Sequence, residues 1–187
     1  RATRNGVPRA HLISRLEDGA LLAELFTNGG NGTMIARDPL VKVRKANIDD
    51  IGKIISLIRP LEEQGILVKR SREHLEMEIG DFSVVEHDDK VYGCVIMHPY
   101  PESSMAELAC LAVAPEKRAA GFGEMLLRHV ESQAHQLGMK SLFVLTTQTS
   151  HWFVERGFKE AGKDALPPSR QQLYNLQRRS KVFVKPL

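Results

Sequence analysis

The sequence predicts an α/β protein built around one sheet, and three observations point to that class. Short apolar runs typical of strands alternate with helical segments from residue 41 onward. Two of these runs, residues 82–86 and 91–98, flank a short polar turn, which predicts an antiparallel hairpin. Between residues 104 and 137, a strand, a glycine-containing loop and an amphipathic helix follow one another. The predicted order after residue 41 is therefore β-α-α-β-β-β-α-β-α-β.

Length and composition are those of a folded protein. The chain has 187 residues, 42% of them hydrophobic and 26% charged, enough for one domain with a core plus an appendage. The formal net charge is +3 and the basic residues are dispersed, so charge does not favour a nucleic-acid partner. Neither a signal peptide nor an apolar stretch of about 18 residues is evident. These features predict a cytoplasmic protein with no membrane partner.

The two cysteines, Cys94 and Cys110, both lie in apolar runs. No Cys-x-x-Cys pair occurs, which argues against a zinc cluster or a disulfide scaffold and favours a reducing compartment. We therefore expect no metal.

The first 36 residues contain a small unit, followed by a predicted linker at 37–41. Its expected elements are a strand at 9–14, a helix at 18–26, a glycine-rich turn at 28–32 and a strand at 33–35. This β-α-β unit is too small to fold alone. Since the sequence also begins without Met, we expect it to be part of a longer protein.

Periodicity and end signals justify the remaining elements. Asn47 is expected to cap a helix that Pro60 ends near residue 59. The apolar face of that helix is formed by Ile51, Ile54, Ile55 and Ile58. The other expected elements are a strand at 41–44, a helix from Ser71 to residue 79, a strand at 104–113, a helix at 121–137 stopped by Gly138, a strand at 141–146, a helix at 151–156 and a strand at 181–184.

The most informative segment is the loop between the strand at 104–113 and the following helix. It contains the pattern Arg118-x-x-Gly121-x-Gly123, and the helix begins at once. Glycines leave backbone N–H groups unobstructed, and a helix N-terminus adds unpaired donors and partial positive charge, so the segment can hold a pyrophosphate. Leu126 excludes the dinucleotide-binding glycine pattern, and Glu124 excludes a P-loop. The alternative is an ordinary helix start with two turn glycines.

In this strand–loop–helix setting the pattern resembles the GNAT superfamily of acyl-CoA N-acetyltransferases. The resemblance covers roughly residues 42–187 and includes Glu155-Arg156-Gly157-Phe158. Within the superfamily the chain is similar to the C-terminal domain of bacterial N-acetylglutamate synthases, and residues 59–70, 107–113 and 151–158 carry that likeness. Residues 1–36 resemble the end of the amino-acid-kinase-like domain that precedes it in those enzymes.

The resemblance implies a GNAT fold, a mixed and mostly antiparallel central sheet flanked by helices. It implies transfer of the acetyl group of acetyl-CoA to the α-amino group of L-glutamate by direct attack, the first step of arginine biosynthesis. It also implies a homo-oligomer in the full-length protein. Arginine would be an effector only with a complete kinase-like domain, of which His11, Glu24 and Gly30 would be fragments.

Acetyl transfer requires a base, because a free α-amine is mostly protonated at neutral pH and an ammonium has no lone pair. Glu107 is the candidate, since a carboxylate within an apolar strand is costly unless it is paired or used. The resemblance supports this role. The alternative places Glu107 on a solvated face or beside a lysine.

The thioester oxyanion requires nearby donors. The resemblance points to the backbone N–H of Leu111 or Cys110. A nucleophilic Cys110 thiol is disfavoured because neither neighbour in the sequence offers a base, so a buried thiol is expected. By resemblance, the expected cofactor residues are Leu111, Ala112 and Val113, which would pair with pantetheine, and Arg118, Ala119, Ala120, Gly121, Phe122, Gly123 and Glu124.

The general acid is open, because Phe153 stands where many relatives have a tyrosine. Thr146, a water or no protein group could protonate the thiolate, and His151 is a weaker candidate.

A dicarboxylate substrate needs cationic anchors. By resemblance these are Arg70 and either Arg178 or Arg179, helped by Ser180 and the backbone of Val68 and Cys110. The alternative places these basic residues on a solvated face.

Two other functions are weighed against glutamate acetylation. One is a GNAT enzyme that acetylates a protein or polyamine amine, which would favour an acidic substrate groove. The other is a non-catalytic acyl-CoA-binding module. The arginines disfavour the first, and Glu107 disfavours the second.

Overall fold

The computed structural model describes residues 7–27, 30–36, 40–88, 90–174 and 180–187. The chain divides into two compact units, Arg1–Val41 and Lys42–Leu187. In the described ranges no helix is both long and apolar enough to cross a bilayer.

The first unit is the expected β-α-β arrangement. It consists of β1 (Arg9–Ile13), α1 (Ala20–Phe26) and β2 (Gly32–Ala36). The two strands pair antiparallel. The Glu24 carboxylate accepts hydrogen bonds from the Asn31 backbone N–H (2.8 Å) and from His11 (2.5 Å), which joins the helix to the middle of β1 and to the residue before β2.

The second unit contains a seven-stranded sheet in the order β3-β4-β5-β6-β7-β9-β8. Its strands are β3 (Val41–Lys45), β4 (Phe82–His87), β5 (Lys90–Tyr100), β6 (Met105–Val113), β7 (Ser141–Thr146), β8 (Lys159–Ala161) and β9 (Lys181–Pro186). The β6–β7 pair is parallel, whereas β4–β5, β5–β6, β7–β9 and β8–β9 are antiparallel. The predicted class, a mixed and mostly antiparallel sheet, is confirmed.

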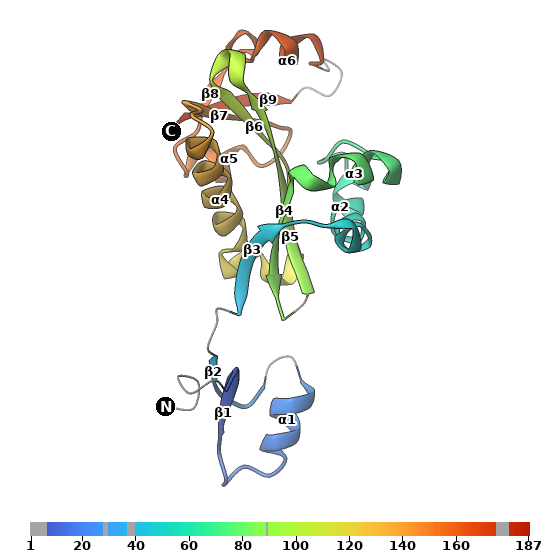
Figure 1. The fold of residues 1–187 in the computed structure, drawn as a ribbon, viewed down its shortest axis with the longest axis vertical. Coiled ribbons are helices and arrows are strands. Elements are labelled where there is room, and N and C mark those ends of the chain that lie inside the picture. The colour runs from blue at the N-terminus through green and yellow to red at the C-terminus, as the bar shows by residue number, and fades with distance from the viewer. Residues whose placement is uncertain (1–6, 28–29, 37–39, 89, 175–179) are drawn as a thin grey trace. The chain divides into compact units, whose positions relative to one another are not determined.

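Helices cover both faces of this sheet, as Figure 1 shows. Helices α2 (Ile51–Glu63) and α3 (Arg72–Glu78) lie on one side, and α4 (Phe122–Gln136) and α5 (Ser150–Val154) lie on the other. Burial follows from this sandwich. Ile54 and Ile58 of α2 are fully buried against sheet residues such as Ile96, and Leu126 and Val130 of α4 are equally buried.

Two predicted helix starts are confirmed by their caps. The Asn47 side chain accepts a hydrogen bond from the Asp49 backbone N–H at 3.0 Å. The Asp50 carboxylate in turn accepts a hydrogen bond from the Asn47 backbone N–H at 3.0 Å. The Ser71 hydroxyl accepts the His74 backbone N–H at 3.2 Å, ahead of α3. The capping residues predicted from the sequence therefore fix where the α2 and α3 segments begin.

Three expectations about elements were wrong. Helix α2 runs through Pro60 to Glu63, because Leu57 and Leu61 pack against the core and offset the one hydrogen bond that proline removes. No helix was predicted between residues 157 and 180, but α6 (Pro168–Gln172) lies there, with a proline at its first position. The three-residue strand β8 was not foreseen either, because so short a strand leaves no periodicity to detect.

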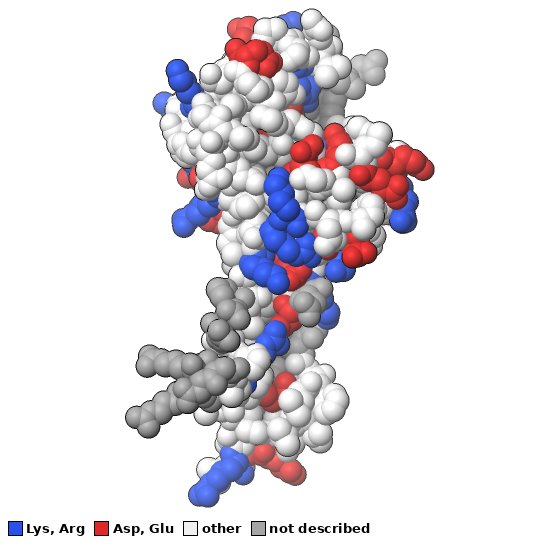
Figure 2. Space-filling view, in the orientation of Figure 1, with Lys and Arg blue, Asp and Glu red and all other residues white. Residues whose placement is uncertain are grey.

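Charges of both signs are mixed on the face shown in Figure 2. Acidic side chains gather over α3, which contributes Glu73, Glu76 and Glu78, and basic side chains lie beside them. A chain-wide net charge of +3 therefore conceals local patches of each sign.

Arg44 on β3 joins the sheet to the start of α2. Its guanidinium donates to both Asp50 oxygens (2.6 and 3.0 Å) and to Glu86 on β4 (2.8 Å). Asp50 is 1% exposed and Glu86 6% exposed. The Arg44 hydrogen bond holds the pKa of Asp50 below its ordinary 3.8, and Lys42, then Arg44, hold the pKa of Glu86 below 4.5, against the opposing effect of burial.

We predict that Arg44→Met lowers the free energy of unfolding by about 3 kcal/mol, the lower end for a buried pair because the guanidinium is partly exposed. The lowered pKa values of Asp50 and Glu86 stabilise the fold at pH values above the ordinary pKa of each carboxyl group. The stability of the wild type therefore falls as the pH drops through the lowered pKa values. The variant lacks a cation that lowers them, so its stability falls less over the same pH range. Urea unfolding between pH 3 and 7 measures both effects.

The matched control is Lys53→Met, which removes a more exposed cation 3.6 Å from the same Asp50 carboxylate. It is expected to cost less than about 1 kcal/mol. Equal losses in the two variants would show that the Arg44 network does not organise this corner.

Candidate active site

The central feature of the second unit is the place where β6 and β7 separate. These parallel strands pair at three positions, Met105–Ser141, Ala106–Leu142 and Glu107–Phe143. Beyond the last pair, β6 continues to Val113 and β7 to Thr146. The two strands are neighbours in the middle of the sheet, so their paired segment ends at Glu107 while both strands run on. We call the two mutually unpaired stretches, residues 108–113 and 144–146, the wedge.

A β-bulge in β6 accounts for this separation. Cys94 of β5 pairs with Ala112, whereas Ile96 pairs with Ala109, so β6 holds one residue more than β5 in this stretch. Within the bulge, Cys110 has φ of +51°, a conformation that L residues rarely adopt. A bulge bends its strand and redirects neighbouring groups. The strain at Cys110 therefore lies where an oxyanion donor was expected.

The strand then leads to the first turn of α4, where backbone donors gather. The first hydrogen bond of this helix joins the Met125 N–H to the Gly121 oxygen at 3.0 Å. The N–H groups of Phe122, Gly123 and Glu124 therefore precede the helical ladder. Together with the positive end of the helix, they suit an anionic group.

Gly121 and Gly123 are needed for different physical reasons. Gly121 has φ of +77°, which disfavours any other residue although the space around it is open. A Cβ at Gly123 would lie 3.2 Å from Cζ2 of Trp152 on α5, so this glycine allows α4 and α5 to approach closely. The sequence suggested only that both would expose backbone to a phosphate.

The other expected cofactor residues line the wedge or the loop. Ala112 and Val113 pair with β5 along one edge of β6, which leaves the other edge toward the wedge. Arg118, Ala119 and Ala120 lie exposed on the loop. Arg118 also lines a cavity of about 310 Å³ against α2.

Glu107 is buried and firmly held. It is 6% exposed, and Arg170 of α6 grips its carboxylate with two hydrogen bonds, Nε to Oε2 at 2.7 Å and Nη2 to Oε1 at 3.0 Å. The Tyr100 hydroxyl of β5 donates to Oε2 at 3.3 Å. This pairing raises the pKa of Arg170, against the effect of burial. The alternative of a solvated or lysine-paired Glu107 is wrong, because the carboxylate is buried and its partner is an arginine.

Tyr100 has a strongly perturbed hydroxyl. Burial, followed by the negative charge of Glu107, raises its pKa to about 12. The Tyr100 ring packs on Phe143, with centroids 5.6 Å apart. Tyr100 therefore remains a hydrogen-bond donor to Glu107 throughout the physiological pH range.

Arg70 lies on the loop between α2 and α3. The Glu62 carboxylate accepts its backbone N–H at 3.0 Å, and its guanidinium donates to the Val68 carbonyl at 3.3 Å. Its charge acts on the buried thiol of Cys110, a residue of the bulge. The structure thus brings Val68, Arg70 and Cys110, three of the expected substrate residues, into one neighbourhood.

The cysteine thiols belong to the core. Cys94 and Cys110 are 0% and 5% exposed, and the Cys94 Sγ lies 3.7 Å from the Cys110 carbonyl oxygen. Its hydrogen bond with Cys110 and burial raise the pKa of Cys94, whereas the hydrogen bond from Cys94, against burial, lowers the pKa of Cys110. A 5% exposed thiol offers little access to a substrate.

Thr146 occupies the β7 arm of the wedge, three residues beyond Phe143, as Cys110 is three residues beyond Glu107 on β6. The Thr146 and Thr149 hydroxyls lie 2.8 Å apart. Phe153 is buried beside Trp152 and Phe158, so the position where relatives have a tyrosine belongs to an aromatic cluster here.

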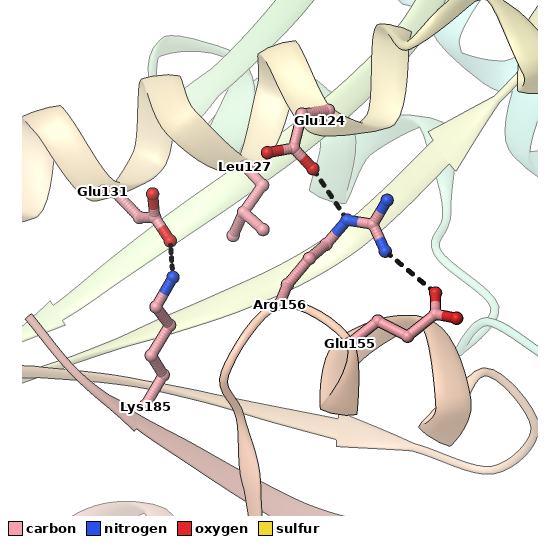
Figure 3. A pocket seen from close by; sticks show the side chains of 6 residues that line it. All are labelled: Glu124, Leu127, Glu131, Glu155, Arg156 and Lys185. Carbon is pink, nitrogen blue, oxygen red and sulfur yellow. Dashed lines mark hydrogen bonds and ion pairs between the residues drawn. The ribbon is translucent and has the colours of Figure 1, made fainter.

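Figure 3 shows a pocket lined by residues of α4, of the turn after α5 and of β9, and its volume is about 430 Å³. Two ion pairs join α4 to the other side of this pocket, Arg156 Nε to Glu124 Oε2 at 2.7 Å and Lys185 to Glu131 at 2.5 Å, and Arg156 also pairs with its neighbour Glu155. Burial raises the pKa of Glu124, but hydrogen bonds from Arg156 and Arg128 outweigh it and leave that pKa lowered. The Glu124 side chain therefore fixes α4 to α5, and its backbone N–H remains the group available to an anion.

The remaining expected substrate residues lie before β9. Ser180 is buried, and its carbonyl accepts the Tyr174 hydroxyl. Arg178 and Arg179 lie outside the described residues.

Sequence reasoning missed Arg170 and Tyr100, the two residues that contact Glu107. Arg170 follows two prolines and a serine in a segment for which the sequence predicted no element, and 63 positions separate it from Glu107. Tyr100 ends a strand whose register with β6 fixes its distance from Glu107. Only the side-by-side placement of β5, β6 and α6 could reveal this cluster.

No group of three or more His, Cys, Asp or Glu side chains that could hold a metal ion occurs in the described part of the chain. The wedge is therefore built from a carboxylate, guanidinium groups and backbone donors.

Comparison with known proteins places this geometry in a class. Residues 78–160 match the family model described as an acetyltransferase (GNAT) domain. A GNAT acetyltransferase from Staphylococcus aureus is 15% identical with a TM-score of 0.66 and covers 79% of this chain and 99% of its own, a likeness of fold alone. Residues 78–160 therefore belong to a GNAT acetyltransferase domain, as the resemblance implied for this part of the sequence.

The more similar relatives are named amino-acid acetyltransferase or N-acetylglutamate synthase. The amino-acid acetyltransferase of Azotobacter vinelandii is 55% identical over 186 residues, which are 100% of this chain and 43% of that protein. N-acetylglutamate synthase from Neisseria gonorrhoeae, solved with coenzyme A and L-arginine, is 44% identical with a TM-score of 0.90. The match covers 100% of this chain and 42% of that one. The structure of the same enzyme with coenzyme A and N-acetyl-glutamate is 46% identical in sequence to this chain, with a TM-score of 0.77. The chain thus spans about two fifths of the length of these relatives.

We predict that Tyr100 stays protonated up to pH 11 in the folded protein, because its pKa is raised to about 12. Tyr100→Phe should leave the 295 nm absorbance change between pH 9 and 11 unaltered. The same titration in guanidinium chloride is the control, where the variant should lose one third of the signal, since the chain has three tyrosines. A one-third loss in the folded protein as well would contradict the assignment.

Proposed function

We propose that this chain transfers the acetyl group of acetyl-CoA to the α-amino group of L-glutamate. The single observation that carries the proposal is the wedge, where a buried carboxylate, an unpaired strand edge and a helix N-terminus meet. Glu107 takes one proton from the substrate ammonium, and the neutral nitrogen then attacks the thioester carbonyl carbon. The C–S bond breaks, the second proton lost from nitrogen ends on the CoA thiolate, and N-acetylglutamate and CoA leave.

The wedge fits acetyl-CoA in two ways. The free edge of β6 at Leu111–Val113 can pair with the amides of pantetheine as a neighbouring strand would. The N–H groups at the start of α4, with Arg118 beside them, suit the pyrophosphate. The thioester carbonyl would then lie near the bulge, where the N–H of Cys110 or Leu111 stabilises the oxyanion. Thr146 on the opposite arm is the proposed donor to the leaving thiolate.

Selectivity for a dicarboxylate rests on two guanidinium groups, one at Glu107 and one near Cys110. Arg70 lies near the bulge and Arg170 touches the proposed base. Arginine binds carboxylates in a bidentate manner, and both side chains are only partly exposed, at 14% and 20%. A polyamine would meet two cations here, which disfavours that alternative. Arg178 or Arg179, with Ser180, completes the proposed set.

Further parts of the assignment are also proposals. We propose that residues 1–36 derive from an amino-acid-kinase-like domain, followed by a linker at 37–41 and the acetyltransferase domain at 42–187. A cytoplasmic homo-oligomer, with arginine as effector where the kinase-like domain is complete, fits this assignment.

Free-thiol release from acetyl-CoA tests the proposed function directly. L-Glutamate, L-aspartate, L-glutamine and spermidine are offered in parallel. Glutamate alone should support release. Release with spermidine instead, or CoA binding without release from any amine, would contradict the assignment to glutamate.

Glu107→Gln is expected to lower kcat by about 10²–10⁴-fold, the usual contribution of a general base. Glu160→Gln, at an exposed carboxylate on β8, is the matched control and should behave as wild type. The measurement is steady-state thiol release at saturating substrates. A similar kcat in both variants would exclude Glu107 as the base.

Arg70→Ala is expected to raise KM for L-glutamate by at least about tenfold, the loss of one charge-assisted contact, with unchanged CoA affinity. Arg72→Ala removes an exposed arginine two residues away, paired with Glu76 on α3, and should leave KM unchanged. Kinetics and CoA titration together test this. Weaker CoA binding without a change in KM for L-glutamate would show that Arg70 does not bind the substrate.

A further inference from the structure

The proposed base is not free in this structure. Arg170 occupies one Glu107 oxygen at 2.7 Å and the other at 3.0 Å, and the Tyr100 hydroxyl adds a contact to the first. A base must direct a lone pair at the ammonium it deprotonates. A carboxylate held on both oxygens by a guanidinium is poorly placed to do so.

The surroundings of Glu107 offer no second carboxylate in the described ranges that pairs with Arg170. His98 and Phe143 flank Glu107 in strand register on β5 and β7. Glu102 hydrogen-bonds Ser169 rather than Arg170. If Arg170 released Glu107, its guanidinium would need a carboxylate from elsewhere, because an unpaired buried charge is costly.

We propose that Arg170 changes partners during the reaction: a carboxylate of the arriving substrate replaces Glu107 on the guanidinium, and this exchange frees Glu107 to act as the base. The inference rests on the proposed function and goes beyond it. Arg170 is thus both a substrate contact and the group that keeps Glu107 inactive until a carboxylate arrives.

The geometry allows such an exchange. One carboxylate replaces another, so the charge pairing and the bidentate hydrogen bonds of Arg170 are conserved. The Arg170 side chain is 20% exposed and belongs to the five-residue helix α6, so solvent reaches it without opening the core. Tyr100, anchored on Phe143, keeps its hydrogen bond to Glu107 and holds the carboxylate in place after release.

Selectivity follows from this arrangement. An amine without a carboxylate offers nothing to Arg170, so Glu107 stays paired and the amine stays protonated. Such amines are rejected at the proton-transfer step, even where they fit the site. Glutamate supplies the carboxylate and the amine in one molecule.

Supplying the two groups separately tests the inference in the unmodified protein. Ethylamine is the amine, and acetate is the carboxylate at constant ionic strength, with acetamide as its neutral control. Acetate should raise ethylamine acetylation at least about tenfold in a saturable manner, a small part of the usual effect of a base, and acetamide should not. No response to acetate would overturn the inference.

Arg170→Gln provides the second measurement. With ethylamine alone the variant should be at least about tenfold faster than wild type, because Glu107 is no longer held, and acetate should have no effect. With glutamate it should be slower, so that the ratio of kcat/KM for the two amines collapses. An equal loss of rate with both amines would indicate a merely structural role and overturn the inference.

Arg170→Lys is the conservative variant and keeps a cation with a single contact. It should retain part of the acetate response and part of the preference for glutamate. The wild-type assay with L-glutamate separates the two hypotheses. If glutamate releases no thiol, the proposed function fails. If glutamate is turned over but acetate does not activate ethylamine, only the partner exchange fails.

Discussion

The separation of β6 from β7 after Glu107 is the constraint on which the second unit depends. A parallel pair in mid-sheet normally continues for the length of both strands, because each backbone group left without a partner costs free energy. Here pairing ends after three positions, and the bulge at Cys110 bends β6 at that point. The unpaired edge of β6 and the position of Glu107 at the end of the pairing both follow from this local departure.

The rest of the fold stabilises that departure. Helix α2 and helix α4 bury their apolar faces against opposite sides of the sheet, so the strained strand is held from both sides. Gly123 lets α4 approach Trp152 on α5, and Arg156 fixes Glu124 across the same contact. The helix that offers backbone donors to an anion is therefore anchored by side chains that do not themselves face the anion.

The cluster of Glu107, Tyr100 and Arg170 connects packing to chemistry. A buried carboxylate requires a cation, and in this fold the cation comes from a short helix at the edge of the site rather than from the core. The partner that stabilises the folded chain thus occupies the group that the proposed reaction needs. The Arg170–Glu107 ion pair must form to stabilise the protein without substrate, and it must open for the proposed reaction.

The sequence by itself determined the alternation of strands and helices, the caps at Asn47 and Ser71, and the loop between β6 and α4, because periodicity, capping and glycine patterns act over a few residues. It also singled out Glu107, whose charge is conspicuous in an apolar strand. Only the tertiary structure decided that Pro60 lies inside a helix, that β6 bulges at Cys110, and that Tyr100 and Arg170 meet Glu107. Those features depend on strand register and on contacts between distant segments, which no local pattern encodes.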